Sequence, residues 1–298
     1  MGFTGQDDLV NQVTNNGKSG VVIYQKTLPA AGVAGACTDL GNAAGTPVAS
    51  TYGAADLTFT ATDNTWSEGA LYHGGDVSTA TKHFLSAGAT AVAAAGAPWF
   101  LFCVDMVGYV KLSGTNVSTT GTKTVTMTAI GSSGAKVDRY ANGEGLKLYM
   151  SASGTLGANA PTCIINYLDT AGNAGATTTF TSTASTTSGH IINSGAAANK
   201  YTPYLPLAAG DTGVSDIVSV VWSGTAHASG TVIVHLVKHL WMLPIPATGL
   251  YTKMDFFNAV PSMRQIKDGA NIRFLLFQTG ATTTGGTVLV DFDYAYGG

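Results

Sequence analysis

Alternation of apolar and polar side chains is the feature that most restricts the fold of this 298-residue chain. Residues 288–294 read Val-Leu-Val-Asp-Phe-Asp-Tyr, so positions 288, 290, 292 and 294 are apolar while Asp291 and Asp293 take the other parity. Successive side chains of a β-strand point to opposite faces, and a strand with one buried and one solvated face gives this pattern. Residues 123–130, Lys-Thr-Val-Thr-Met-Thr-Ala-Ile, alternate in the same manner.

Strand-like segments recur along the chain, separated by clusters of Gly, Asn, Ser and Asp that favour turns. They occupy residues 21–28, 57–62, 99–112, 123–130, 146–152, 162–168, 177–182, 216–223, 231–243, 271–278 and 287–295. Helical crossovers, which parallel strands require, are not indicated between them. The sequence therefore predicts an all-β fold, an antiparallel β-sandwich or jelly-roll-like architecture.

One short helix is expected before the first strand, over residues 4–15. Thr4 suits its N-cap, and Leu9, Val10 and Val13 form a short apolar stripe. A helix of about three turns is marginal alone, so this stripe needs a surface, either this fold or a neighbouring subunit.

Two further segments are interpreted from the proline and glycine residues in or near them. Residues 252–259, which precede Pro261, are expected to form a second short helix. Residues 87–104 carry no charge until Asp105, but Gly88, Gly96 and Pro98 interrupt them. They are interpreted as a loop followed by a buried strand.

Domain boundaries are placed where the pattern is weakest. Residues 1–20 are expected to form an N-terminal arm or short helix, residues 21–135 a β-rich domain and residues 136–298 a β-sandwich domain. The second boundary follows Gly131-Ser-Ser-Gly-Ala135, a composition typical of a flexible link. The alternative is one composite domain.

Charge is scarce in this chain. It has 14 Lys and Arg and 17 Asp and Glu, so charged residues make up 10 % and the formal net charge is −3. A soluble domain usually has about 25 % charged residues. Binding to nucleic acid or to an anionic membrane needs a basic face, so the composition argues against both partners. It favours a component that makes close, repeated protein contacts.

The three cysteines, Cys37, Cys103 and Cys163, do not suggest a disulfide framework, because their number is odd and the chain is long. Cys103 and Cys163 lie in apolar runs and are expected to be buried thiols. Cys37 lies in a segment rich in Gly and Ala and is expected to be exposed.

No group of residues predicts a catalytic, cofactor or metal site. His235 and His239 have the spacing of helical zinc ligands, but their surroundings read as a strand, which would hold them roughly 13 Å apart on its polar face. The polar segment 72–83 lacks the turn that carries a nucleophile in a Ser/His/Asp site. Asp291 and Asp293, roughly 7 Å apart on one strand face, have the residue types of a glycosidase pair or a Ca²⁺ site, but strand alternation produces them without either.

Partner contacts are expected at exposed apolar and aromatic side chains. Trp66 lies among polar residues, where an aromatic ring is suited to contact a protein or a sugar. The candidate contact residues are Leu9, Val10, Val13, Trp66 and Tyr72.

Five segments carry a family resemblance. They are His73-Gly-Gly-Asp-Val-Ser-Thr-Ala-Thr-Lys-His83, Arg139-Tyr-Ala-Asn-Gly-Glu-Gly-Leu146, Tyr204-Leu-Pro-Leu-Ala-Ala-Gly-Asp-Thr-Gly213, Pro261-Ser-Met-Arg-Gln-Ile-Lys-Asp-Gly-Ala-Asn-Ile-Arg-Phe-Leu275 and Asp291-Phe-Asp-Tyr-Ala-Tyr-Gly297. These segments resemble parts of tailed-bacteriophage virion structural proteins. The resemblance implies a particle component without catalytic residues to carry over, and it does not say which part of the particle.

Composition and resemblance together favour a non-enzymatic head decoration or cement protein in the virion. Its expected partners are the major capsid protein and further copies of itself, as a homo-oligomer and specifically a trimer, with assembly in the host cytoplasm. Many copies bound to the mature lattice would stabilise it by mass action. The alternative is a tail-associated or fibre protein that contacts the host receptor, and a carbohydrate-binding or carbohydrate-active protein is the third class.

Overall fold

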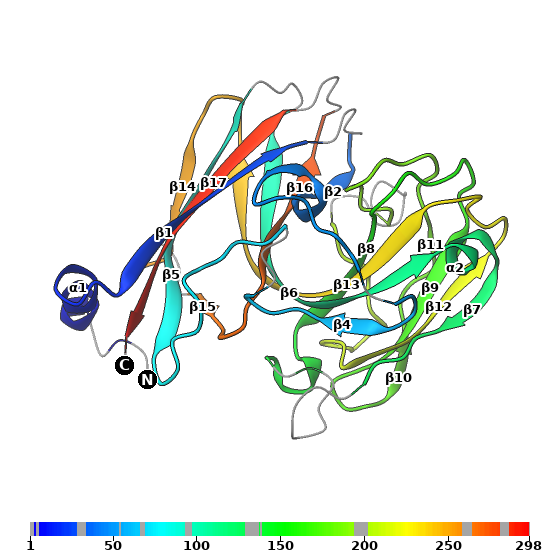
Figure 1. Ribbon diagram of the computed structural model, residues 1–298, viewed down its shortest axis with the longest axis horizontal. Helices are drawn as coiled ribbons and strands as arrows, with labels where there is room; N and C mark the ends of the chain where they lie inside the picture. The colour runs from blue at the N-terminus through cyan, green and yellow to red at the C-terminus, as the bar shows by residue number, and fades with distance from the viewer. Residues whose placement is uncertain are drawn as a thin grey trace.

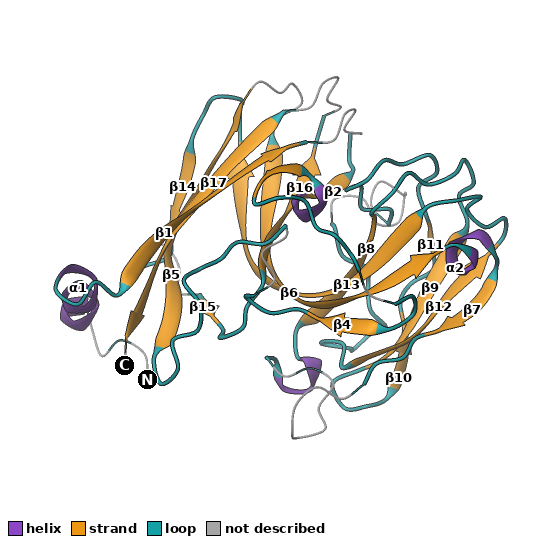
Figure 2. Ribbon diagram, viewed as in Figure 1, coloured by secondary structure: helices purple, strands orange, loops and turns teal. Residues whose placement is uncertain are grey.

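Three antiparallel sheets make up the molecule, with a strongly curved central sheet between two outer sheets (Figure 1). The computed structural model describes residues 3, 6–28, 34–53, 55–65, 69–92, 97–128, 137, 139–193, 202–257, 264–280 and 286–297. Strands dominate this part of the chain and helices are short (Figure 2). The predicted all-β class, with antiparallel sheets packed as sandwiches and a short N-terminal helix, is confirmed.

The central sheet contains the two longest strands, which cross the whole molecule. Its order is β2 (Cys37–Asp39), β16 (Ile272–Gln278), β6 (Trp99–Ser113), β13 (Thr231–Ile245) and β8 (Leu146–Ala152), with β4 (Phe59–Ala61) also paired to β6. In Figure 1, β6 and β13 curve beneath the middle of the molecule and join its two halves.

The first outer sheet contains both ends of the chain. Its order is β14 (Thr252–Asp255), β5 (Thr81–Val92), β17 (Thr287–Gly297), β1 (Ser19–Thr27) and β3 (Ala44–Thr46), with β15 (Gln265–Ile266) paired to β5. Helix α1 (Gln6–Thr14) packs against β17.

The second outer sheet is smaller. Its order is β10 (Ala174–Ala176), β9 (Thr162–Leu168), β12 (Asp216–Ser223) and β7 (Gly121–Thr124), with β11 (Phe180–Thr181) paired to β9. The short helix α2 (Thr115–Ser118) and two 3₁₀ turns, Leu40–Asn42 and Ala141–Gly143, complete the elements.

On one face the long strands contribute to two hydrophobic cores in turn, and a third hydrophobic cluster lies on their opposite face. On β6, Leu101 and Cys103 belong to the core under the first outer sheet, here the first core, whereas Val110 and Leu112 belong to the second core, under the second outer sheet. The parity of the buried positions changes because a β-bulge at Val107 shifts the pairing with β13. The extra residue lets one face of the strand cover two sheets.

The agreement of the strand predictions does not follow the strictness of the alternation. The observed bounds of β8, β9 and β12 coincide with the predicted ones. The predicted strand 123–130 is shorter, since β7 ends at Thr124.

Two predictions are wrong, and they concern neighbouring strands. Residues 81–92 form the twelve-residue strand β5, although residues 87–92 were expected to be a loop. Residues 252–255 form strand β14, which pairs with β5 from Thr252 opposite Ala89 to Asp255 opposite Ser86, in place of the expected helix. Alanine and glycine have low strand propensity, so the residues of β5 do not indicate a strand. Burial, rather than intrinsic propensity, stabilises this strand.

The strands of the predicted domains are interleaved. Each sheet combines strands from both sides of residue 135, and β1 pairs with β17 along its whole length. Strand β1 begins at Ser19, inside the predicted arm 1–20. The predicted link 131–135 lies outside the described residues. The interleaving favours the alternative of one composite domain.

All three cysteines are buried thiols that form no disulfide. Cys103 lies in the first core and Cys163 in the second, as predicted for buried thiols. Cys37 was expected to be exposed and is instead fully buried, because it lies on β2 opposite Phe277. Among the helices of the described residues, none has the length and apolar character needed to cross a membrane.

Candidate functional site

The chain buries several of its few charged side chains. Those buried in the described residues are Lys26, Asp39, Lys82, Asp105, Asp216 and Arg273. A buried charge is costly unless it is paired and hydrogen-bonded, and functional sites are common places for such groups. The clusters around these charges are therefore the candidate sites.

The largest cluster lies on the face of the central sheet opposite the two cores and centres on Asp39 and Arg273. Neither side chain has exposed surface, and Arg273 Nη1 lies 3.9 Å from Asp39 Oδ2. Arg273 also donates from Nη1 to the Tyr52 hydroxyl at 3.1 Å and from Nε to Asn271 Oδ1 at 3.2 Å. Burial raises the pKa of Asp39 above its usual value, although the guanidinium acts in the opposite direction. The pair is a structural link between β2 and β16.

A glycine makes this close approach feasible. The Asp39 carboxylate accepts a hydrogen bond from the Gly41 backbone N–H at 2.8 Å and caps the 3₁₀ turn Leu40–Asn42. A Cβ at position 41 would lie 2.6 Å from Arg273 Nη1. The turn therefore lies against the guanidinium only because it carries no side chain at this position.

Ser151, His235 and Asp39 meet in this cluster and have the residue types of a nucleophilic triad. Ser151 Oγ lies 2.8 Å from His235 Nε2, and Asp39 Oδ2 lies 3.5 Å from the same nitrogen. A catalytic triad needs the acid on one imidazole nitrogen and the nucleophile on the other. Here Nδ1 faces Met106 Sδ at 3.4 Å, and the three triad-type side chains are all fully buried. The arrangement does not support nucleophilic catalysis.

His235 and His239 lie on a strand, as predicted, but not on a wet face. His235 is fully buried and stacked on Tyr149 with ring centroids 4.3 Å apart, and burial lowers its pKa well below the usual value. His239 Nδ1 lies 3.0 Å from the Tyr204 hydroxyl, and burial lowers its pKa to about 4. Within the described ranges, no three His, Cys, Asp or Glu side chains are grouped to hold a metal ion.

Asp105 and Arg139 form a second cluster where β6 passes from the first core to the second. Arg139 donates from Nε to Asp105 Oδ2 at 3.1 Å and from Nη2 to Oδ1 at 3.0 Å. The Tyr140 hydroxyl donates to Oδ2 at 3.0 Å, and the Asn271 backbone N–H donates to Oδ1 at 2.9 Å. Four charge-assisted hydrogen bonds, two of them in a bidentate pair, occupy this carboxylate and make it a clamp between the two cores.

Lys82 and His73 form a third cluster, in the polar segment 72–83. Lys82 Nζ donates to the carbonyls of His73 at 2.7 Å and Gly75 at 2.6 Å. His73 Nε2 lies 2.9 Å from the Ala270 carbonyl, so Nε2 carries the proton and Nδ1, 3.1 Å from Lys82 Nζ, accepts. Nζ also lies 4.9 Å from the ring centroid of Tyr294, within cation–π range. These contacts brace the turn that leads into β5.

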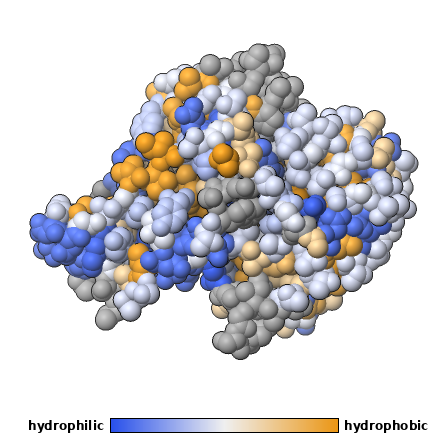
Figure 3. Space-filling view, viewed as in Figure 1, coloured by the Kyte–Doolittle hydropathy of each residue, from blue (hydrophilic) through white to orange (hydrophobic). Residues whose placement is uncertain are grey.

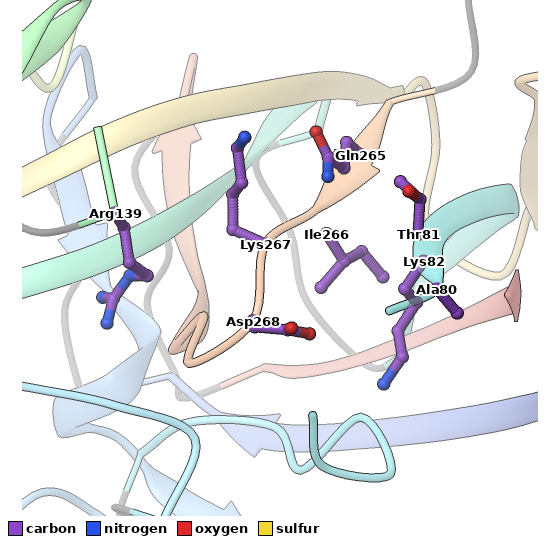
Figure 4. A pocket seen from close by; sticks show the side chains of 8 residues that line it. All are labelled: Ala80, Thr81, Lys82, Arg139, Gln265, Ile266, Lys267 and Asp268. Atoms are coloured by element: carbon purple, nitrogen blue, oxygen red, sulfur yellow. The ribbon is translucent and has the colours of Figure 1, made fainter. Parts of the chain in front are cut away.

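A pocket of about 220 Å³ lies between the second and third clusters (Figure 4). Its lining residues are Ala80, Thr81, Lys82, Arg139, Gln265, Ile266, Lys267 and Asp268. The charged groups of Lys82 and Arg139 are engaged as described above, and Asp268 accepts a hydrogen bond from the Val77 backbone N–H at 3.1 Å. Ligand pockets are usually apolar and about 300–1,000 Å³, so this polar recess has neither the size nor the lining of one.

The carboxylates Asp291 and Asp293 lie on the outer face of the first outer sheet, each with its own partners. The Tyr251 hydroxyl donates to Asp291 Oδ2 at 2.9 Å. Ser86 donates to Asp293, and Lys253 Nζ lies 3.5 Å from Asp293 Oδ2. Neither lines the pocket described above, so the geometry gives the glycosidase interpretation no support.

The predicted contact residues divide into three groups. Val10 and Tyr72 are 51 % and 63 % exposed and are available to a partner, and Val13 is half-buried. Leu9 is buried where α1 packs against β17, so in this chain it anchors the helix to its own sheet. Trp66 lies outside the described residues.

Strand β1 has exposed apolar side chains that were not predicted. Val21 and Ile23 are each 67 % exposed, and Val48, just after β3, is 62 % exposed. Figure 3 shows apolar surface over the part of the first outer sheet where β1 and β17 run. The strand was predicted, but alternation alone does not say which of two apolar faces is covered.

The buried charge clusters were also missed, although a signal for them exists. Asp105 follows the apolar run 99–104, and Arg273 stands between Ile272 and Phe274. A single charge inside an apolar strand predicts a buried partner, because it cannot remain unpaired there.

Comparison with known proteins identifies no relative: no family model, no curated protein and no solved structure matches the chain. Conclusions about function therefore rest on the residues themselves.

Proposed function

We propose that the protein is a non-enzymatic virion structural component, an outer-capsid decoration or cement protein that binds the major capsid protein as a homo-oligomer. The observation that carries the proposal is a surface with few charges and exposed apolar strand residues. The phage resemblance of the five segments agrees with it.

Burial of charge strengthens the compositional argument. Charged residues make up 10 % of the chain, and six of those in the described ranges are buried, so few charges remain for the surface. Surfaces of soluble proteins that remain monomeric usually have about 25–35 % charged residues. Exposed apolar side chains such as Val21, Ile23 and Val48 on such a surface favour protein contacts.

The buried polar clusters support a structural role. The ionisable groups around Asp39, Asp105 and Lys82 are enclosed and bonded to other protein groups. Enclosed, fully bonded groups hold strands together, whereas a catalytic group needs access to substrate. A shell component needs this kind of rigidity.

The copy number per virion tests the proposal. Quantitative mass spectrometry of purified particles against the major capsid protein is expected to give hundreds of copies in a fixed ratio to the capsid subunit. A few to a few dozen copies would replace the head assignment with the tail or fibre alternative. Absence from the particle would overturn the virion proposal.

A second test asks whether the protein stabilises the shell. Removing it is expected to lower the temperature at which the shell ruptures, because ligands that bind only the assembled lattice stabilise that lattice. An unchanged rupture temperature would leave a decoration protein without a cement function.

The N-terminal helix offers a test of lattice contact. Deleting residues 1–16 removes α1 but leaves β1 paired with β17, so the β fold is expected to remain while capsid binding weakens. Val10→Asp is the matching point variant, and Val218→Asp, on the second outer sheet, is its control. Full decoration by the truncated protein would contradict a role for the helix.

A further inference from the structure

Strand β1 is an open edge of the first outer sheet over half of its length. It pairs with β17 from Ser19 to Thr27, whereas β3 covers its other side only at residues 25–27. In the part of the chain that the structure describes, no strand pairs with that side of residues 19–23.

The backbone groups of this edge can be assigned from the ladder. The N–H and C=O of alternate residues in an antiparallel strand point to the same neighbour. The Lys18 carbonyl accepts from Tyr296 and the Leu28 N–H donates to Gly286, so the even-numbered residues face β17. The odd-numbered residues, Ser19, Val21 and Ile23, therefore direct their N–H and C=O groups toward the open edge.

Within the described ranges, this edge lacks the features that normally prevent strand pairing. Natural edge strands are protected by charges, proline, bulges or a covering loop. Residues 19–24 read Ser-Gly-Val-Val-Ile-Tyr, without charge or proline, and their pairing with β17 has no bulge. The side chains of Val21 and Ile23 are largely exposed.

We infer that residues 19–23 of β1 pair with the same residues of a second copy, antiparallel about a two-fold axis at Val21. In this register Ser19 lies opposite the second copy's Ile23, and Val21 lies opposite its equivalent. All the outward backbone groups are then used, in about six hydrogen bonds. The two first outer sheets become one continuous sheet.

A second copy fits this edge better than an unrelated strand because the edge is complementary to itself. A two-fold interface brings the same patch together from both subunits. The segment carries no charge, and Asp291 and Asp293 lie one strand inward, on β17. The acidic rows of two paired copies would be three strand spacings apart, about 14 Å, which exceeds the screening length of about 8–10 Å.

The flanking residues support the same pairing. Val48 follows β3 at the Gln25 end of the open segment, and α1, with exposed Val10, precedes its Ser19 end. Antiparallel pairing brings the Ser19 end of one copy beside the Gln25 end of the other. Exposed apolar side chains therefore flank both ends of the paired segment.

This inference deepens the proposed function, because it names the surface through which copies associate and makes the basic unit a two-fold dimer in place of the expected trimer. It depends on the edge of β1 and not on the presence of a capsid. Copy number in virions and association of the purified protein therefore test the two separately.

Sedimentation velocity of the full-length protein over a concentration series is the first test. We expect a monomer–dimer equilibrium that Val21→Pro weakens at least tenfold, since proline removes the outward N–H and is tolerated at a strand edge. Val21→Lys is expected to have the same effect. Val92→Lys is the matched control, because Val92 is also exposed on this sheet but lies on the inner strand β5, and it is expected to leave the dimer unchanged.

Cross-linking tests the register directly. Hydrogen-bonded residues opposite each other have Cα atoms about 5.5 Å apart, within the range of a disulfide. Val21→Cys is therefore expected to form a disulfide-linked dimer under mild oxidation, while Val92→Cys is not, and the native cysteines are buried. A monomer at all concentrations without this cross-link would overturn the inference. So would a dimer or trimer that Val21→Pro and Val21→Lys leave intact, or pairing of the edge only with a capsid-protein strand.

Discussion

The two cores beneath the outer sheets are filled by different kinds of side chain. The first core is rich in aromatic rings, namely Tyr24, Phe84, Trp99, Trp241, Phe256, Phe274, Phe292 and Tyr294. The second core contains mainly Val, Leu, Ile and Met, with fewer rings. Both are built on the same two long strands, but the rings of the first core come from both of its sheets, with Trp99, Trp241 and Phe274 on the central sheet.

The aromatic core explains why its outer sheet contains a strand of alanines. Ala87, Ala89 and Ala91 of β5 are fully buried in the first core, where Phe84 and Phe292 have ring centroids 5.1 Å apart. Large rings pack at native density only where small residues lie opposite them. The second core, with side chains of intermediate size, has no need of such a strand.

The largest expected effect comes from breaking the clamp that both cores share. Asp105→Ala leaves the half-buried Arg139 guanidinium without its carboxylate and is expected to lower the free energy of unfolding by about 3–5 kcal/mol. Chemical denaturation measures this loss, and mass-spectrometric thiol labelling shows where it acts. Labelling of Cys103 and Cys163 is expected to accelerate together, because each reports one core.

Asp268→Ala is the matched control for the clamp, since this exposed carboxylate is expected to change stability by no more than about 0.5 kcal/mol. A loss below about 1 kcal/mol for Asp105→Ala would contradict the clamp.

A larger side chain in the first core should destabilise that core more than the second core. Ala89→Leu places a larger side chain among the aromatic rings and is expected to cost about 1–3 kcal/mol. Labelling of Cys103 should rise more than that of Cys163. Ala174→Leu, at an exposed position of β10, is the control. Equal acceleration of both thiols would show that the cores open as one unit.

Acidification should destabilise mainly the second core and the face of the central sheet opposite the first and second cores. Burial lowers the pKa values of His227, beside Trp222, of His190, His235 and His239, and of His73 in the turn that leads into β5. Near pH 6.5 the histidines of the unfolded chain bind protons, while those of the folded chain stay neutral. The stability that these neutral histidines contribute is therefore present above that pH and is lost as pH falls toward about 4. The raised pKa of Asp39 opposes this loss.

The expected loss between pH 7 and pH 5 is on the order of 1 kcal/mol or more, measured by denaturant titration at each pH. Cys163 and Cys37 should become reactive before Cys103. Stability that rises on acidification would contradict the assignment of these histidines as neutral.

The smallest effect is expected on the outer face of the first sheet. Tyr251→Phe removes an exposed hydrogen bond to Asp291 and should change stability by less than about 0.5 kcal/mol. Thermal unfolding of this variant beside Tyr149→Phe, which removes a buried hydrogen bond to Asp39, gives the contrast. A larger effect at Tyr251 would show that the outer face is part of the stabilising core.

Residue patterns within short segments were sufficient to predict most strands and the burial of two of the three thiols. The bounds of β8, β9 and β12 follow from runs of strand-forming residues bounded by turn-forming residues. Residue patterns did not predict β5, because small residues on both of its faces obscure the two-residue period of a strand. They also failed at Cys37, whose burial depends on Phe277, far away in the sequence.

The sequence by itself determined the all-β class, the short N-terminal helix and the scarcity of charge. Tertiary structure decided which charges are buried and which strand edge stays open. Asp39 meets Arg273 and His235, and Asp105 meets Arg139 and Asn271, only because the central sheet brings distant segments together. The pairing partner of a buried charge, like the neighbour of an edge strand, is a property of long-range contacts. The periodicity of apolar residues within a segment does not predict the partner of a buried charge or the neighbour of an edge strand.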